Sequence, residues 1–161
     1  MAVAYISIGS NVDAKTNIRA ALAALEARYG KLTLSTTYRN SAVGFDGDDF
    51  LNLVVAVDTE QSILDFVESL HDIEAAQGRI RNTAKFSPRT LDMDLLLYDS
   101  EVFHSATISI PRDEITRYAF VLQPLFELIP DYTHPILNKT IAEIWAAFDK
   151  TDINMQALKS L

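Results

Sequence analysis

Hydrophobic and polar positions alternate along two stretches of the chain, residues 2–8 and residues 50–59. A period of two places successive side chains on opposite faces, so both stretches are predicted to be half-buried strands. In the second stretch Asn52 shares a face with apolar even-numbered residues, and the odd-numbered residues from 51 to 57 are all aliphatic. A buried amide needs hydrogen-bonding partners, so Asn52 pairs either with backbone of a neighbouring loop or with a planar heterocycle.

A helical period of apolar residues follows the first strand. Gly9-Ser10-Asn11 is expected to end that strand, and a helix is predicted over residues 14–29. Asn11 or Asp13 is the expected N-cap of this helix, and Gly30 its terminator. The short Gly-Ser-Asn segment is interpreted as a plain turn rather than a phosphate-binding loop.

The second helix is predicted to run from its N-cap Ser62 to Gly78. Glu74 continues its apolar stripe and lies in the last turn, where the helix dipole disfavours negative charge. A carboxylate in such a place indicates a partner, which the sequence leaves open between Arg79 or Arg81 and a nucleotide.

An apolar run from Leu91 to Tyr98 contains two carboxylates, Asp92 and Asp94. Its length and composition are typical of a buried strand, in which residues two apart project to the same face. Adjacent like charges on a partly buried surface are costly unless they are neutralised. Just upstream lie four of the chain's 14 lysines and arginines, namely Arg79, Arg81, Lys85 and Arg89.

These charges allow two interpretations. The arginines and aspartates form an ion-pair network that holds a loop onto the sheet, or the aspartates bind Mg²⁺ while the arginines bind phosphates. The residues alone do not choose between them.

Other segments complete an α+β prediction. Residues 32–39 and 50–59 are two strands without an intervening helix, which favours a mainly antiparallel sheet flanked by helices. Residues 40–49 are expected to form a lid or pocket wall. The remaining elements are a hairpin with strands near 101–103 and 106–110, a short helix after Pro111, a final helix over 140–148 and a fraying tail from Lys150.

Composition narrows the functional classes. The 161 residues suit one domain, and 48% hydrophobic with 22% charged residues is typical of a globular protein. A net charge of −8 argues against nucleic-acid binding, while the basic cluster is the right size for one polyphosphate. The absence of cysteine excludes disulfides and thiolate metal sites. With no signal peptide or membrane span recognisable, a cytoplasmic protein is expected.

The stretch GRIRNTAKFSPRTLDMDLLLYD, residues 78–99, resembles the signature of the 6-hydroxymethyl-7,8-dihydropterin pyrophosphokinase family. The blocks AYISIGSN, FLNLVVAV, IEAAQGRIR and FVLQPLFELIPDYTHP resemble the family in the same order. The resemblance implies a single ferredoxin-like α+β domain, monomeric, that transfers pyrophosphate from ATP to the pterin hydroxymethyl group in folate biosynthesis and releases AMP. It also implies two Mg²⁺ ions and no partner beyond ATP and a dihydropterin.

The resemblance also assigns roles to individual residues. Asp92 and Asp94 correspond to the metal ligands, and Arg79, Arg89 and Asp94 to the catalytic set. Contacts with ATP are implied for His71, Glu74, Arg79, Arg81, Arg89, Leu95 and Arg112. Contacts with the pterin are implied for the side chains of Phe50, Asn52, Phe86 and Phe120 and for backbone near Asn40 and Val43.

The sequence departs from the family pattern around the nucleotide. Arg112 stands where the family usually has a His, and Tyr118 where it has an Arg, with Arg117 one step earlier. Phe86 replaces a Trp, Asp113 a Pro or aromatic residue, and Asn40-Ser41 a Thr-Pro pair. Two alternatives therefore stand beside the active enzyme: a paralogue that binds a pterin or nucleotide with weak or no transfer, and an enzyme for a different pterin-like alcohol.

Overall fold

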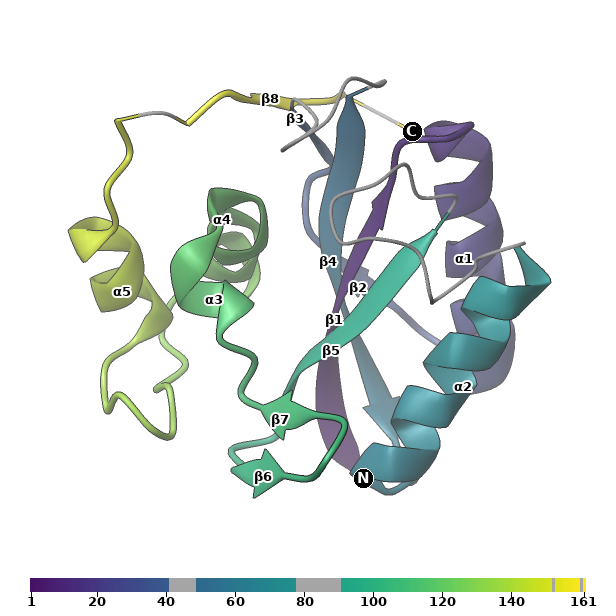
Figure 1. Cartoon of the computed structure of the whole chain (residues 1–161), viewed down its shortest axis with the longest axis horizontal. Coiled ribbons are helices and arrows are strands. Elements are labelled where there is room, and N and C mark those ends of the chain that lie inside the picture. Colours follow the sequence, from purple (N-terminus) through teal and green to yellow (C-terminus); the bar gives the residue numbers. More distant parts are fainter. Residues whose placement is uncertain (41–48, 78–90, 152, 160) are drawn as a thin grey trace.

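The computed structural model describes residues 1–40, 49–77, 91–151, 153–159 and 161. A central sheet separates two layers of helices (Figure 1). Helices α1 (Ala14–Tyr29) and α2 (Ile63–Ala76) cover one face. On the other face α4 (Ala119–Leu128) packs on the sheet, with α3 (Glu114–Arg117) and α5 (Ile141–Ala147) packed against it. Within the described ranges no helix combines the length and apolar character of a membrane span.

The sheet is antiparallel and has the strand order β5-β1-β4-β3-β8, with β2 also pairing with β4. The first elements run strand–helix–strands–helix–strand, with β1 in the middle between β4 and β5. This is the ferredoxin-like topology, so the predicted fold class is confirmed. The strands are β1 (Ala2–Ser10), β2 (Thr33–Leu34), β3 (Tyr38–Asn40), β4 (Phe50–Thr59), β5 (Asp92–Tyr98) and β8 (Met155–Ala157). A separate hairpin pairs β6 (Phe103–His104) with β7 (Ser109–Ile110).

Two predictions about the strands were wrong in detail. The first strand does not end at Gly9 but runs through Ser10, because β4 pairs with it along its whole length. The predicted strand over residues 32–39 is two short strands, β2 and β3. Between them Ser35 N–H donates to Val54 O at 2.9 Å, but Val54 N–H donates to the Ser35 hydroxyl, also at 2.9 Å, so a side chain replaces one bond of the regular ladder there.

The C-terminal tail does not fray as expected. Residues 155–157 form β8, which pairs with β3 and adds a strand to that side of the sheet. A strand of three residues, of which Gln156 and Ala157 are exposed, is too short for a periodic pattern, so the sequence contains no signal for it.

The helix predictions hold at the start of α2 and at the end of α1. Helix α2 ends at Ala76 with Gln77 as its C-cap, and its predicted terminator Gly78 lies outside the described residues. The Ser62 hydroxyl accepts a hydrogen bond from Asp65 N–H at 3.2 Å and caps α2. Gly30 ends α1 with a φ of 83°. Asp13 takes the N-cap position of α1, but in a left-handed conformation and without a side-chain capping bond, so that part of the prediction was wrong.

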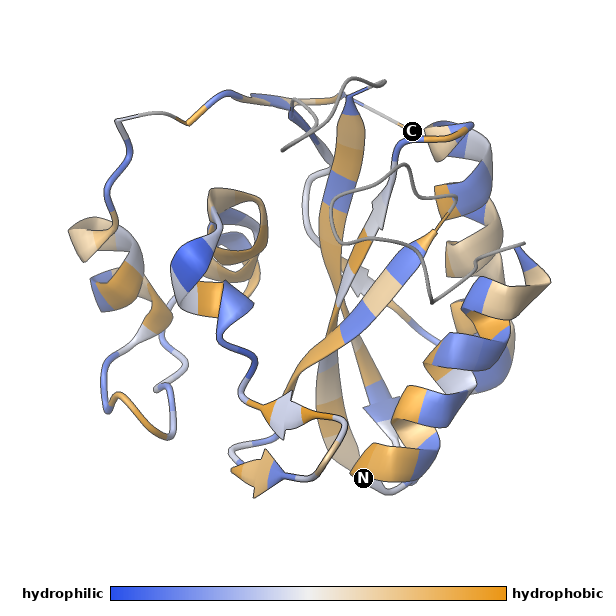
Figure 2. Cartoon of the chain, in the orientation of Figure 1, coloured by the Kyte–Doolittle hydropathy of each residue, from blue (hydrophilic) through white to orange (hydrophobic). Residues whose placement is uncertain are grey.

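Two apolar clusters lie on the two faces of the sheet. The first, under α1 and α2, contains Ile6 and Ile8 of β1 and the odd-numbered residues 51–57 of β4, as the alternation predicts. The second, under α4, contains Val54, with Tyr5 packed against it. Figure 2 shows the strands as mainly hydrophobic and the helices as mixed.

A bulge in β5 decides which side chains face which cluster. Along β1 the register passes from Leu97 opposite Tyr5 to Leu95 opposite Ile6, so Leu96 is an extra residue. As a result Leu95 and Tyr98 both enter the first cluster, and Leu96 enters the second.

Candidate functional site

The two aspartates of β5 lie on the face of the sheet that α4 covers. Asp92 is opposite Gly9 and Asp94 is opposite Ser7, and both side chains are half-buried. Ser7 and Gly9 share the face of Tyr5, which packs in the cluster under α4. The predicted strand and the shared face of the two carboxylates are therefore confirmed.

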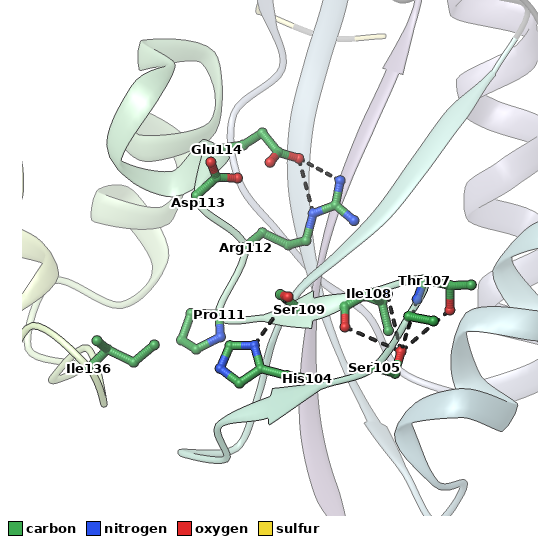
Figure 3. A pocket seen from close by; sticks show the side chains of 11 residues that line it. His104, Ser105, Thr107, Ile108, Ser109, Pro111, Arg112, Asp113, Glu114 and Ile136 are labelled. Carbon is green, nitrogen blue, oxygen red and sulfur yellow. Dashed lines mark hydrogen bonds and ion pairs between the residues drawn. The ribbon is translucent and has the colours of Figure 1, made fainter.

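A guanidinium is fixed beside this pair. Arg112 Nε and Nη2 donate to Glu114 Oε2 at 3.0 and 2.6 Å, and Nη2 lies 3.8 Å from Asp94 Oδ1. The Arg112 backbone N–H donates to Leu96 O, the carbonyl of the bulge residue, at 3.1 Å. Figure 3 shows the Arg112 side chain projecting from the segment between β7 and α3, with Glu114 hydrogen-bonded to its guanidinium.

The electrostatic environment keeps Arg112 charged. Partial burial acts to lower the pKa of its guanidinium, but Asp94, Glu114 and Asp92 outweigh that effect, so the pKa is raised. Arg112 also lines a pocket of about 610 Å³, together with Ile108 and Ser109 of the hairpin. Arg112 thus lies between this pocket and Asp94, and a cation fixed there suits the binding of an anion that carries a metal ion.

The other nucleotide candidates lie on the side of β5 that faces α2. Glu74 is 1% exposed, and its Oε2 accepts the Met93 backbone N–H at 2.8 Å. The amide between the two aspartates is thus one partner of Glu74, and the predicted options Arg79 and Arg81 lie outside the described residues. His71 is half-buried one turn earlier on α2, and Leu95 packs in the first cluster on the face opposite the aspartates.

A buried amide lies on the same face as the aspartates, two strands away. Asn52 of β4 is opposite Gly9 of β1, which is in turn opposite Asp92 of β5. Asn52 is 5% exposed, and its Nδ2 donates to Asn40 Oδ1 on β3 at 2.5 Å. A Cβ atom added to Gly9 would lie 2.6 Å from Asn52 Oδ1, so the absence of a side chain at Gly9 leaves room for the amide.

Two of the predicted aromatic residues come from different elements, Phe50 from the sheet and Phe120 from α4. Phe50 begins β4 and shares the face of Asn52. On α4, Phe120 is half-buried and stacks on Tyr118 with ring centroids 5.0 Å apart and planes 20° apart. The Arg117 guanidinium lies 5.4 Å from the Tyr118 ring centroid and pairs with Asp113 at 3.3 Å.

Five of the predicted site residues fall outside the described residues. They are Val43, Phe86 and the arginines Arg79, Arg81 and Arg89.

The structure adds two residues that the sequence analysis missed and one new contact. Gly9 was interpreted as part of a turn, and Glu114 had no assigned role. The side chain of Asn40 contacts Asn52, whereas the family pattern implied a role for backbone near Asn40. The signal for Gly9 is its place between Asn52 and Asp92 on the two neighbouring strands. That signal can be recognised only when the strand register is known.

The carboxylate pair fits one kind of metal site. In the described part of the chain no three His, Cys, Asp or Glu side chains gather as a protein-only metal cage. Mg²⁺ typically binds one or two carboxylates and takes its other ligands from substrate phosphates and water. Two half-buried aspartates on one face, with the Arg112 guanidinium 3.8 Å from Asp94, match that donor set.

Comparison with known proteins gives one consistent result. Residues 5–130 match the family model described as 7,8-dihydro-6-hydroxymethylpterin-pyrophosphokinase. The chain is 35% identical over 139 residues to a 2-amino-4-hydroxy-6-hydroxymethyldihydropteridine pyrophosphokinase of Haemophilus influenzae, covering 84% of this chain and 86% of the relative. It is 36% identical over 135 residues to the protein of that name from Pseudomonas aeruginosa, covering 81% of this chain and 83% of the relative.

Solved structures support the fold. A structure described as HPPK-DHPS in complex with substrates matches with a TM-score of 0.77 at 15% identity over 99% of this chain. Plasmodium falciparum HPPK-DHPS with pterin and p-hydroxybenzoate matches with a TM-score of 0.74 at 16% identity over 90% of this chain. The chain spans 47% and 42% of those two solved chains.

Proposed function

The chain belongs to the 7,8-dihydro-6-hydroxymethylpterin-pyrophosphokinase family, and from this premise we propose how its own residues carry out the family's reaction. The reaction transfers pyrophosphate from ATP to the hydroxymethyl group of 6-hydroxymethyl-7,8-dihydropterin in folate synthesis. The observation that supports our assignment of residues is the row formed by Asn52, Gly9 and Asp92 across three neighbouring strands.

This row sets the distance between the proposed pterin-binding residue Asn52 and the proposed metal ligand Asp92. Strands lie about 4.8 Å apart, so the backbones at Asn52 and Asp92 are about 10 Å apart on one face of the sheet. A bicyclic ring held at Asn52 and between Phe50 and Phe120 spans most of that separation. Its hydroxymethyl arm then points toward the phosphates held at Asp92 and Asp94.

We assign the binding of Mg²⁺ to Asp92 and Asp94, with two ions present when ATP is bound. Mg²⁺ at this place supplies charge neutralisation for the triphosphate. Arg112, oriented by Glu114, holds a phosphate of the nucleotide, and Arg79, Arg81 and Arg89 neutralise the rest of its charge. Glu74 and Leu95 are 1% exposed on the opposite face of β5, so of the three candidates next to α2 only the half-buried His71 is assigned a side-chain contact with the nucleotide.

The transfer itself needs positioning more than a covalent nucleophile. The pterin hydroxyl oxygen forms a bond to the β-phosphorus, and the bond from that phosphorus to the oxygen of the α-phosphate breaks, which releases AMP. Asp94 is the carboxylate assigned to take the hydroxyl proton. Asn40, Val43 and Phe86 complete the pterin pocket and exclude water that would otherwise accept the phosphate.

AMP release on mixing the protein with ATP, Mg²⁺ and 6-hydroxymethyl-7,8-dihydropterin tests this proposal. We expect AMP formation to require both the pterin and Mg²⁺. Asp92→Asn and Asp94→Asn should each lower the rate at least about 100-fold, since loss of even an outer-shell partner of a metal costs 10- to 100-fold. Asp58→Asn, which removes an exposed carboxylate of β4, is the matched control.

Two results would count against the proposal. A near-parental rate in either aspartate variant would remove the metal assignment. Pterin binding without AMP formation by the unmodified protein would favour the paralogue or the different acceptor that the altered positions left open.

We also propose that the protein works as a monomer in the cytoplasm. Sedimentation of the purified protein tests the monomer, and a dimer at micromolar concentration would contradict it.

A further inference from the structure

The side chain of Asn40 makes a contact that the family pattern does not imply. Asn40 ends β3, and its Oδ1 accepts a hydrogen bond from Nδ2 of Asn52 on the neighbouring strand at 2.5 Å. The strand register pairs Asn52 with Tyr38, so Asn40 and Asn52 are diagonal neighbours on one face.

This contact fixes a choice that a carboxamide otherwise leaves open. The oxygen and nitrogen ends of an amide have nearly the same shape, and only their hydrogen-bonding partners distinguish the two orientations. With Nδ2 directed to Asn40, the oxygen end of Asn52 lies over Gly9, where a Cβ atom would be only 2.6 Å away. No described residue donates a hydrogen bond to Asn52 Oδ1.

The remaining hydrogen-bonding groups of Asn52 are one N–H and one carbonyl oxygen. Because Asn52 is 95% buried, these groups need a partner, and a donor–acceptor pair is what the pyrimidine edge of a pterin presents. If the amide turned over, its acceptor and its donor would exchange places, and each would meet a like group of the ligand.

We propose that Asn40 is a positioning residue for pterin recognition, which acts by holding the Asn52 amide in one orientation. This inference rests on the proposed function. Asn40 thereby fixes the donor and the acceptor of Asn52 before the ligand arrives. A larger fraction of the free protein is then ready to bind the pterin.

The test compares two variants of Asn40 by calorimetry. The ligand is 6-hydroxymethyl-7,8-dihydropterin, titrated in the presence of Mg²⁺ and α,β-methylene-ATP, whose bridging carbon prevents transfer. Asn40→Leu removes the acceptor and should raise the pterin Kd about 3- to 10-fold, the range of one net hydrogen bond. Asn40→Asp keeps an acceptor and should stay within about 2-fold of the parent protein.

Binding of α,β-methylene-ATP should be unchanged in both variants. Gln156→Leu, on the neighbouring strand β8 and exposed, is the control for altering this edge of the sheet.

A double-mutant cycle shows whether Asn40 acts through Asn52. In an Asn52→Ala background the orientation no longer matters, so adding Asn40→Leu should change the pterin Kd by less than about 1.5-fold. An equal loss in both backgrounds would overturn the proposal, because Asn40 would then act through its own contacts with the ligand or loop.

Other outcomes also decide the matter. Unchanged binding by Asn40→Leu would overturn the inference and leave the proposed function intact. Tighter binding would also overturn it, since the bond would then compete with the ligand. If the parent protein bound no pterin, the proposed function would fail and this inference with it.

Discussion

The contact between Glu74 and Met93 leads to a prediction whose size follows from the structure. Both residues are 1% exposed, and the Met93 N–H donates to Glu74 Oε2 at 2.8 Å. β5 is an edge strand, so on this side the α2 helix supplies the acceptor that another strand would otherwise provide. Replacing Glu74 by Leu fills a similar volume and leaves the buried N–H without that acceptor.

An unsatisfied buried N–H costs roughly 1–3 kcal/mol. For a chain of this length each kcal/mol lowers the Tm by about 2–4 °C, so the Glu74→Leu variant should melt roughly 2–12 °C below the parent. Glu74→Gln keeps an acceptor and loses only the charge, which should cost about 1 kcal/mol or less. Thermal unfolding of the two variants side by side separates the acceptor from the charge.

Amide hydrogen exchange gives the local measurement. The Met93 amide should exchange faster in Glu74→Leu, while amides in the middle of β4 keep their protection relative to global stability. If the Met93 amide were equally protected in the Leu variant and the Tm unchanged, Glu74 would not be the group that satisfies it. Equal losses in the Leu and Gln variants would instead mean that the carboxylate charge matters and the acceptor does not.

Three further predictions address other parts of the molecule. Gly9→Ala places a Cβ 2.6 Å from Asn52 Oδ1, so calorimetry should show pterin affinity lowered at least about 10-fold with nucleotide binding retained; equal loss of both ligands would contradict it. Glu114→Gln weakens the hydrogen bonds that orient Arg112, so the KM for ATP should rise about 5-fold while the pterin Kd stays unchanged. An unchanged KM would show that Glu114 does not orient Arg112. His134 Nδ1 accepts two backbone N–H groups at 3.2 Å and burial lowers its pKa, so the unfolded chain binds the proton first on acidification. The stability it contributes is therefore complete above the unfolded pKa of about 6.5 and lost as pH falls through the folded pKa; Tm measured from pH 8 to 5 should fall more in the parent than in His134→Gln.

Periodicity predicted the long elements of the fold, because alternation and helical spacing place their aliphatic side chains in the core between the sheet and the helices α1 and α2. The strands β1 and β4 and the helices α1 and α2 follow from alternation and helical spacing alone. The break between β2 and β3 does not, since part of it depends on Glu127, which accepts the Thr36 N–H at 2.8 Å from 91 residues away. A contact that distant has no local pattern in the sequence.

The site divides in the same way. The shared face of Asp92 and Asp94 follows from their spacing, but the bond from the Met93 amide to Glu74 was not predictable, because a backbone amide leaves no mark in the sequence. The anchoring of Arg112 by Glu114 joins residues two apart in a turn, where no regular period applies.

The bulge at Leu96 explains why the carboxylates and the amide meet on one face. Ala4 is opposite Tyr98, and a regular register from there would place Asp94 opposite Ile8. Ile8 belongs to the core under α1 and α2, so Asp94 would then be buried among aliphatic side chains at a cost of several kcal/mol. The one extra residue moves Asp94 opposite Ser7 and Asp92 opposite Gly9, in the row that contains Asn52. The Leu96 carbonyl also accepts the Arg112 N–H, so the same bulge sets the position of the fixed cation beside the aspartates.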